Sequence, residues 1–174
     1  MKKLLMLLAV LALVFTLAVG CSSQSGSEEA PEETPEEAQE ETNNDEGINV
    51  AELEDGTYYA EDDEFSNGWK YNVTIVVKDG KIVDATWNGE NEEGGDDKVT
   101  LSEKGEYGMV EKGNASAEWH EQAALAEAYL LEVQDPTAIE YTTEEGHTDA
   151  IAGATIHVKE FFDLAQKALA SNPQ

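Results

Sequence analysis

Two adjacent residues, Asp79 and Gly80, most constrain the fold of this chain, because they separate two runs that favour β-strands. Residues 68–77 (GWKYNVTIVV) and 81–87 (KIVDATW) are rich in β-branched and aromatic side chains. An Asp-Gly pair between two such runs is a strong signal for a tight hairpin turn, since Gly adopts the positive φ that such a turn requires. We therefore predict an antiparallel hairpin over residues 68–87.

Alternation along this hairpin predicts which side chains share a face of the sheet. In the first strand one face carries Tyr71, Val73, Ile75 and Val77. In the second strand the same reasoning places Ile82 on the opposite face from Val83, Ala85 and Trp87.

Further elements are predicted on both sides of the hairpin. A short edge strand is expected over residues 55–60 and another strand over residues 139–143. Apolar residues at helical spacing predict a helix over residues 117–133, with Ser116 as its N-cap, and a last helix over residues 157–170. Strands in a block with helices on one side give an α+β fold, here a small antiparallel sheet with a β-hairpin core and two main helices packed against it.

The N-terminus has the pattern of an export signal. Lys2 and Lys3 precede a continuous apolar run over residues 4–19, which suits the hydrophobic region of a signal peptide. The run ends in LAVGC, which resembles the lipobox of bacterial lipoproteins, where a Cys receives lipid. Residues 1–21 are therefore predicted to be a lipoprotein signal peptide that leaves the chain anchored at Cys21 on the extracytoplasmic side of the cell membrane. The alternative is a plain secretory peptide with Cys21 free.

Residues 22–48 form an acidic segment with ten Asp and Glu and no basic residue. Such a segment cannot offset its ordering entropy, and we predict a disordered linker that extends by self-repulsion. The remaining residues, 49–174, suffice for one domain with a formal charge of −20. The whole chain contains no Arg, so nucleic-acid binding is excluded as a function class.

Metal binding and hydrolysis find little support in the sequence. His120, His147 and His157 are separated by 27 and 10 residues, unlike compact zinc motifs, so no metal site is predicted. The acidic stretch 90–97 lies in a segment, 88–98, whose Gly-rich composition predicts a mobile loop, and it lacks the ligand order of a calcium-binding loop. No nucleophile motif is present, and no catalytic residue is predicted.

The stretch DAIAGAT, from Asp149 to Thr155, precedes the predicted last helix. Backbone N–H groups at a helix N-terminus can bind an anion such as a phosphate, and Gly153 would allow a ligand to approach the backbone closely. By these mechanics alone, however, an ordinary capped helix remains the more frequent outcome.

The same stretch resembles the D-x-x-S-G-A-T signature of FMN-binding domains. Residues 55–87, which begin DGTYYAEDD, and the closing segment AGAT…F…L…KAL are also similar to this family. The resemblance implies that the phosphate of FMN is esterified to Thr155, that Gly153 and Ala154 form the turn beneath it, and that Asp149 is read by a flavin transferase. Two departures from the family pattern are Ala152, where Ser is usual, and Ile156–Val158, where small hydroxyl residues are usual.

Several aromatic residues are candidates to stack on the flavin ring, namely Trp69, Trp87, Tyr107 and Trp119, and Met109 is a candidate to line it. The resemblance implies a monomeric electron carrier that relays electrons from a membrane quinol or dehydrogenase to extracellular acceptors. Two alternatives remain open at this point. One is a lipoprotein that binds flavin or another small ligand noncovalently, with Thr155 only a helix cap. The other is a structural surface lipoprotein without a cofactor.

Overall fold

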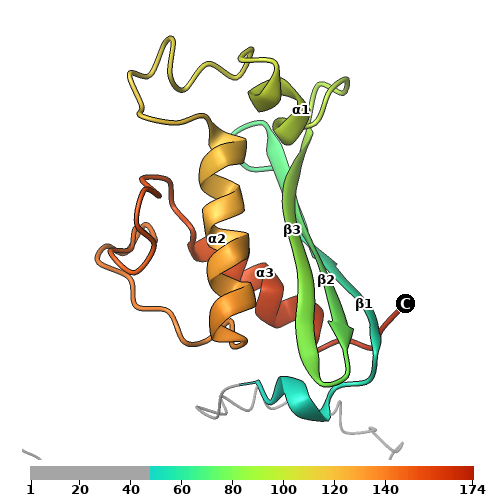
Figure 1. Ribbon diagram of the computed structural model, residues 1–174. Helices are drawn as coiled ribbons and strands as arrows, with labels where there is room; N and C mark the ends of the chain where they lie inside the picture. The colour runs from blue at the N-terminus through green and yellow to red at the C-terminus, as the bar shows by residue number, and fades with distance from the viewer. Residues whose placement is uncertain (1–47) are drawn as a thin grey trace, which may run out of the picture. The chain divides into compact units, whose positions relative to one another are not determined.

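The computed structural model describes residues 48–174 (Figure 1). The predicted signal peptide and lipobox with Cys21, and residues 22–47 of the predicted linker, lie outside the described residues. Within the described part, none of the helices has the length and apolar character needed to cross a membrane.

A three-stranded antiparallel sheet forms one layer of the fold, and helices cover one of its faces (Figure 1). Its strands are β1 (Gly56–Glu61), β2 (Trp69–Lys78) and β3 (Lys81–Asn91), paired in chain order. A short 3-10 helix, η1 (Val50–Glu52), precedes β1. The hairpin and the edge strand are confirmed, and so is the α+β class.

The predicted facing of Ile82 is wrong, because the β2–β3 ladder contains an irregularity. Val76 pairs with Asp84 but Val77 pairs with Ile82, which leaves one extra residue, Val83, on β3. The extra residue reverses the alternation, so Ile82 is buried together with Ala85 and Trp87 while Val83 is 49% exposed. The tight turn at Asp79–Gly80 is present, and both residues have positive φ.

Helix α2 (Trp119–Val133) lies along β3 (Figure 1). Its N-cap is Glu118, not the predicted Ser116, because Glu118 and Glu121 form a reciprocal capping box. Two side chains at and near the other end of α2 bind β3 directly: Gln134 Oε1 accepts from the Ile82 N–H at 2.8 Å, and Glu127 Oε1 accepts from the Trp87 N–H at 2.7 Å.

Helix α3 (Lys159–Leu169) packs on β1 and β2. The apolar spacing of this segment predicts an inner face of six residues, and all six are buried: Val158, Phe161, Phe162, Ala165, Ala168 and Leu169. The helix begins two residues later than predicted, with Val158 as its N-cap.

The strand predicted over residues 139–143 is wrong, since no strand occurs there in the described chain. Backbone carbonyls in and beside this segment are satisfied by side chains instead of by a neighbouring strand. The Ala138 carbonyl accepts from the Tyr129 hydroxyl at 3.1 Å, and the Glu140 carbonyl accepts from the Thr148 hydroxyl at 2.6 Å.

The region predicted as a mobile loop is partly regular. Strand β3 continues to Asn91, and a short helix, α1 (Lys98–Glu103), follows. Asp97 caps α1 by accepting from the Thr100 N–H at 2.7 Å. This capping Asp ahead of Val99 and Leu101 is the sequence signal that would have indicated α1.

Candidate functional site

An aromatic pocket of about 280 Å³ lies between the inner face of the sheet and the N-terminal end of α2. Its principal wall is a chain of rings in which the Trp87 and Trp119 centroids lie 4.9 Å apart and those of Tyr71 and Trp87 lie 5.7 Å apart. The pocket is lined by Tyr71, Trp87, Lys98, Tyr107, Met109, Trp119, Thr155, Ile156, His157 and Glu160. The site therefore combines four Tyr and Trp rings with one lysine and one carboxylate.

Lys98 is the buried cation of this pocket and is only 2% exposed. Its ammonium lies 4.4–5.0 Å from the ring centroids of Trp69, Tyr71, Tyr107 and Trp119, and it donates a hydrogen bond to the Tyr71 hydroxyl. Burial lowers the pKa of Lys98 to about 8. The electron-rich ring faces stabilise the ammonium form and so oppose this shift. The pocket thus holds a positive charge at neutral pH, and removing the proton from Lys98 there takes less free energy than from a lysine in water.

Glu160, in the first turn of α3, is the carboxylate of the pocket. Burial, and then the negative charge of Asp62, raises the pKa of Glu160 to about 7, while Lys98 opposes the shift. A proton can therefore enter or leave this carboxyl near neutral pH.

The raised pKa of Glu160 predicts a measurable pH dependence of stability. Between pH 4.5 and 7 the folded chain retains a proton that the unfolded chain releases, so this contribution to stability is present at low pH and is lost as the pH rises to 7. We expect the free energy of unfolding of wild type minus that of Glu160→Gln to fall by about 2 kcal/mol over this window, after allowance for partial solvation. Urea titrations of both proteins at several pH values measure it, and a flat or rising difference would contradict the prediction.

Thr155 lies at the edge of the pocket with its side chain exposed. Its N–H and its hydroxyl both donate to one oxygen, Gln122 Oε1, at 2.6 and 3.0 Å. Gln122 is a fully buried residue of α2 whose amide nitrogen donates to the Ala117 carbonyl at 3.0 Å, so its orientation is fixed. Gln122 is a site residue that the sequence did not reveal.

The predicted place of Thr155 at the N-terminus of the last helix is wrong, since α3 begins at Lys159. The segment between them is held away from the helix because the Val158 N–H donates to the Gly146 carbonyl at 2.9 Å and the Thr155 N–H is taken by Gln122. A phosphate at Thr155 would consequently meet the hydroxyl rather than a free N–H of that residue.

Of the other predicted site residues, some line the aromatic pocket and others lie outside it. Met109 lines the pocket, whereas Trp69 does not line it and packs edge-on against Tyr107, with 5.9 Å between the ring centroids. Gly153, with φ +92°, forms the predicted turn together with Ala154, whose N–H donates to the Ile151 carbonyl at 3.2 Å. Asp149 is exposed and does not line the pocket.

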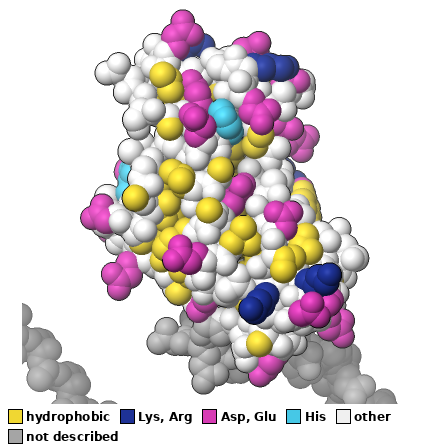
Figure 2. Space-filling view, in the orientation of Figure 1, with side chains coloured by type: hydrophobic (Ala, Val, Ile, Leu, Met, Phe, Trp, Pro, Cys, Tyr) yellow, Lys and Arg dark blue, Asp and Glu magenta, His cyan; other side chains and the backbone are white. Residues whose placement is uncertain are grey.

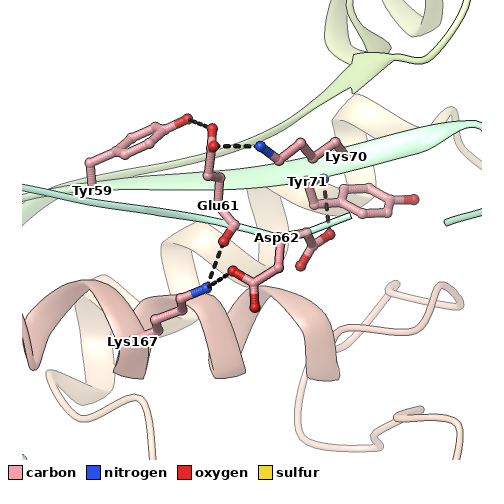
Figure 3. A network of polar contacts seen from close by, with 7 residues as sticks. Tyr59, Glu61, Asp62, Lys70, Tyr71 and Lys167 are labelled. Carbon is pink, nitrogen blue, oxygen red and sulfur yellow. Dashed lines mark hydrogen bonds and ion pairs between the residues drawn. The ribbon is translucent and has the colours of Figure 1, made fainter. Parts of the chain in front are cut away.

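A larger hollow of about 570 Å³ adjoins the aromatic pocket and shares Tyr71, His157 and Glu160 with it. Five carboxylates and two lysines line this hollow: Asp62, Asp63, Glu145, Glu160 and Asp163, with Lys159 and Lys167. Figure 3 shows part of its wall, where the Lys167 ammonium donates to the Glu61 carbonyl and the Tyr71 N–H donates to Asp62. Its acidic lining disfavours an anionic ligand, so the smaller aromatic pocket is the better candidate site.

The face of the molecule drawn in Figure 2 carries Asp and Glu side chains throughout, with apolar side chains between them and few Lys. Among the described residues Lys98 is the one buried Lys. The aromatic pocket therefore holds a buried positive charge within a strongly acidic domain.

The fold and the pocket define a small α+β ligand-binding domain with a site suited to a planar aromatic ligand. Over residues 68–170 the sequence matches the FMN-binding domain family. This match spans more than half of the chain, and the chain belongs to the FMN-binding domain family; it is a flavin-binding protein.

Two solved structures resemble this chain. A solution NMR structure of a Clostridium thermocellum protein has 63% sequence identity and a TM-score of 0.55, with 70% of this chain and 95% of that chain covered. A crystal structure of a Clostridium perfringens protein has 29% identity and a TM-score of 0.52, with 68% and 87% covered. No curated protein matches this chain.

Proposed function

We propose that this chain is a membrane-anchored extracytoplasmic flavoprotein that carries FMN esterified to Thr155. It relays electrons from a membrane quinol or dehydrogenase to extracellular acceptors. A dedicated flavin transferase forms the ester by transferring FMN from FAD to the Thr155 hydroxyl, with AMP as the leaving group. The observation that carries the proposal is the position of Thr155, whose exposed side chain stands at the edge of the aromatic pocket. The lipobox-like sequence ending in Cys21 supports the anchor, and the absence of Arg fits a phosphate that is held covalently.

The residues of the pocket fit a flavin. The isoalloxazine ring is planar and aromatic, and such a ring can pack against the aromatic side chains that line the pocket, which are Tyr71, Trp87, Tyr107 and Trp119. Trp87 Nε1 is buried and has no hydrogen-bond partner among the described residues, so it is a donor that an acceptor atom of a ligand would satisfy. A pocket of about 280 Å³ suits a ring system, with the phosphate outside it at Thr155.

When bound, FMN supplies reversible one-electron and two-electron transfer. The chain itself contributes binding, charge and proton positions. Gln122 orients the Thr155 hydroxyl, Trp87 and Trp119 exclude water, and the Lys98 ammonium supplies positive charge beside the aromatic wall. Glu160 can hold or release a proton at its carboxyl near pH 7.

Thr155→Val is expected to abolish covalent flavin attachment, because valine has nearly the same shape but no hydroxyl to esterify. The full chain is co-expressed with a flavin transferase and run on a denaturing gel under ultraviolet light, and its intact mass is measured. Wild type should give a fluorescent band and a mass increase of one FMN less one water, and the variant should give neither the fluorescence nor the mass increase.

The matched control is Thr86→Val, which removes an exposed hydroxyl from the outer face of β3. This control should be flavinylated like wild type. A nonfluorescent wild-type band with an unmodified mass would contradict the covalent proposal, and so would a Thr155→Val band as fluorescent as that of wild type.

A second candidate function is noncovalent flavin binding, with Thr155 in a purely structural role. One observation favours it: the Thr155 hydroxyl already donates to Gln122 and so helps to hold the turn onto α2. Flavin that copurifies with the chain but dissociates on denaturation would select this candidate. A chain with no flavin by either route would point to a structural surface lipoprotein.

A further inference from the structure

A cluster of three metal-ligand side chains lies beside the aromatic pocket and has no part in the proposed flavin chemistry. Glu145, His147 and His157 each present a ligand atom, and these atoms all lie within 4.8 Å of one another. We propose that these three residues form a binding site for a divalent transition-metal ion of the Zn²⁺ type. The spacing of the histidines in the sequence alone predicts no metal site, whereas the fold brings His147 and His157 together.

The backbone brings the two histidines together. The Val158 N–H donates to the Gly146 carbonyl at 2.9 Å, so the residues next to this bond, His147 and His157, are placed side by side. Their ring centroids lie 4.3 Å apart. The turn that carries His147 is closed by a second bond, from the Thr142 N–H to the His147 carbonyl at 2.7 Å. Two segments ten residues apart are thus held in register.

The ligand atoms are available and partly oriented. His147 Nδ1 lies 3.1 Å from the Thr143 hydroxyl, an arrangement that fixes the ring and leaves Nε2 free, as in metal-bound histidines. His157 Nε2 lies 3.9 Å from Glu145 Oε2. The nearby Lys159 ammonium is paired with Asp163 and does not occupy the cluster.

The donor set determines the kind of ion. Two imidazoles and one carboxylate suit Zn²⁺ with a water as fourth ligand, whereas Mg²⁺ and Ca²⁺ prefer oxygen ligands alone. Bonds of about 2.1 Å draw tetrahedral ligand atoms to about 3.4 Å from one another. The ligand atoms of the cluster lie within 4.8 Å of one another, so the side chains need to close by up to about 1.4 Å. Glu145 and His157 are exposed side chains with room to make this movement.

The surroundings favour a cation. Glu145 and His157 also line the acidic hollow, which carries Asp62, Asp63 and Asp163. This concentration of carboxylates raises the local concentration of cations. Because His157 lines the aromatic pocket as well, a bound ion would place positive charge close to Thr155.

The test is calorimetric titration of the flavin-free full chain in detergent with zinc chloride, in a Cys21→Ser background that removes the lone thiol. A millimolar excess of Mg²⁺ in physiological salt occupies the nonspecific carboxylate sites. We expect one Zn²⁺ per chain. His147→Asn, His157→Asn and Glu145→Gln should each weaken binding about tenfold or more.

Two controls match these changes. Glu144→Gln removes the neighbouring carboxylate of the same exposed turn, and His120→Asn removes the histidine that lies elsewhere, against Ser102. Both should bind zinc like wild type. In an NMR titration of the unaltered cluster, the ring signals of His147 and His157 should move with zinc while those of His120 stay fixed.

Absence of a one-to-one zinc complex would overturn the proposal. So would binding that survives both histidine substitutions, or binding that Glu144→Gln weakens as much as Glu145→Gln does. These measurements need no flavin, so their failure leaves the proposed function standing, and a failure of flavin attachment leaves the metal site standing.

Discussion

Gly146→Ala is expected to lower the free energy of unfolding by more than about 3 kcal/mol. Gly146 has φ +96°, a conformation that side chains rarely adopt. A Cβ placed on it would lie 2.3 Å from Lys159 Cβ and 3.1 Å from the Lys159 nitrogen. Those atoms belong to the first residue of α3 and cannot move without shifting the helix. Urea unfolding followed by circular dichroism measures the loss.

Gly95→Ala is the matched control for this change. Gly95 has a similar φ of +90°, but a Cβ there meets nothing within 4 Å, so the control reports the backbone cost alone, about 1 kcal/mol. The additional loss of unfolding free energy in Gly146→Ala, relative to Gly95→Ala, measures how tightly this turn packs against α3. Equal losses in the two variants would show that the contact is not tight and that the turn does not fix the position of His157.

Lys98→Met is expected to stabilise the flavin-free protein at pH 7 by about 2 to 3 kcal/mol. Methionine keeps the length and the apolar body of the side chain and removes a charge that is desolvated in the fold. The depressed pKa of about 8 reflects this desolvation, and the four surrounding rings offset part of its cost. Comparison of urea unfolding midpoints for the two proteins tests the gain.

The gain should depend on pH in a definite direction. The pKa of Lys98 is lowered from 10.5 to about 8 by folding, so between these values the unfolded wild type binds more protons than the folded one. Wild-type stability therefore rises with pH in this window, and the advantage of Lys98→Met shrinks from pH 8 to pH 10.5. Lys104→Met, in the exposed residue that follows α1, should change stability little at any of these pH values. A Lys98→Met protein that is less stable than wild type at pH 7 would contradict this prediction. It would show that the four rings around the Lys98 ammonium stabilise the charge by more than burial destabilises it.

By this expectation, Lys98 lowers the stability of the flavin-free fold at the candidate site. Residues that destabilise the fold are common at positions where the residue is retained for function. Lys98 is accordingly the residue of the pocket whose presence packing explains least.

Periodic apolar patterns account for the parts of the fold that the sequence predicted. The hairpin, the stripe of α2 and the inner face of α3 all follow from which residues must be buried together. The extension of β3 through Gly89 escaped prediction because its composition is that of a loop. In the fold, Gly89 lies opposite Tyr71, and a Cβ there would come within 3.3 Å of the Tyr71 ring and 3.4 Å of the Trp69 ring. The glycine makes room for aromatic side chains.

The site was predictable only where a motif marks it. DAIAGAT pointed to Thr155, but the partner of Thr155 lies 33 residues away on α2 and carries no local signal. Lys98 followed an acidic stretch and looked like a solvated loop residue, because its burial depends on rings from β2, α2 and the segment at Tyr107. Such contacts arise only when distant elements meet, and one sequence does not show them.

The contacts between α2 and β3 have a consequence for how molecules of this kind meet each other. The outer edge of β3 would ordinarily present backbone N–H groups that invite another chain to add a strand. Here the N–H groups of Ile82 and Trp87 are already bound by Gln134 and Glu127. A fourth strand would have to displace the helix side chains first. This edge of the sheet is therefore protected from pairing with the sheet of another copy of the chain.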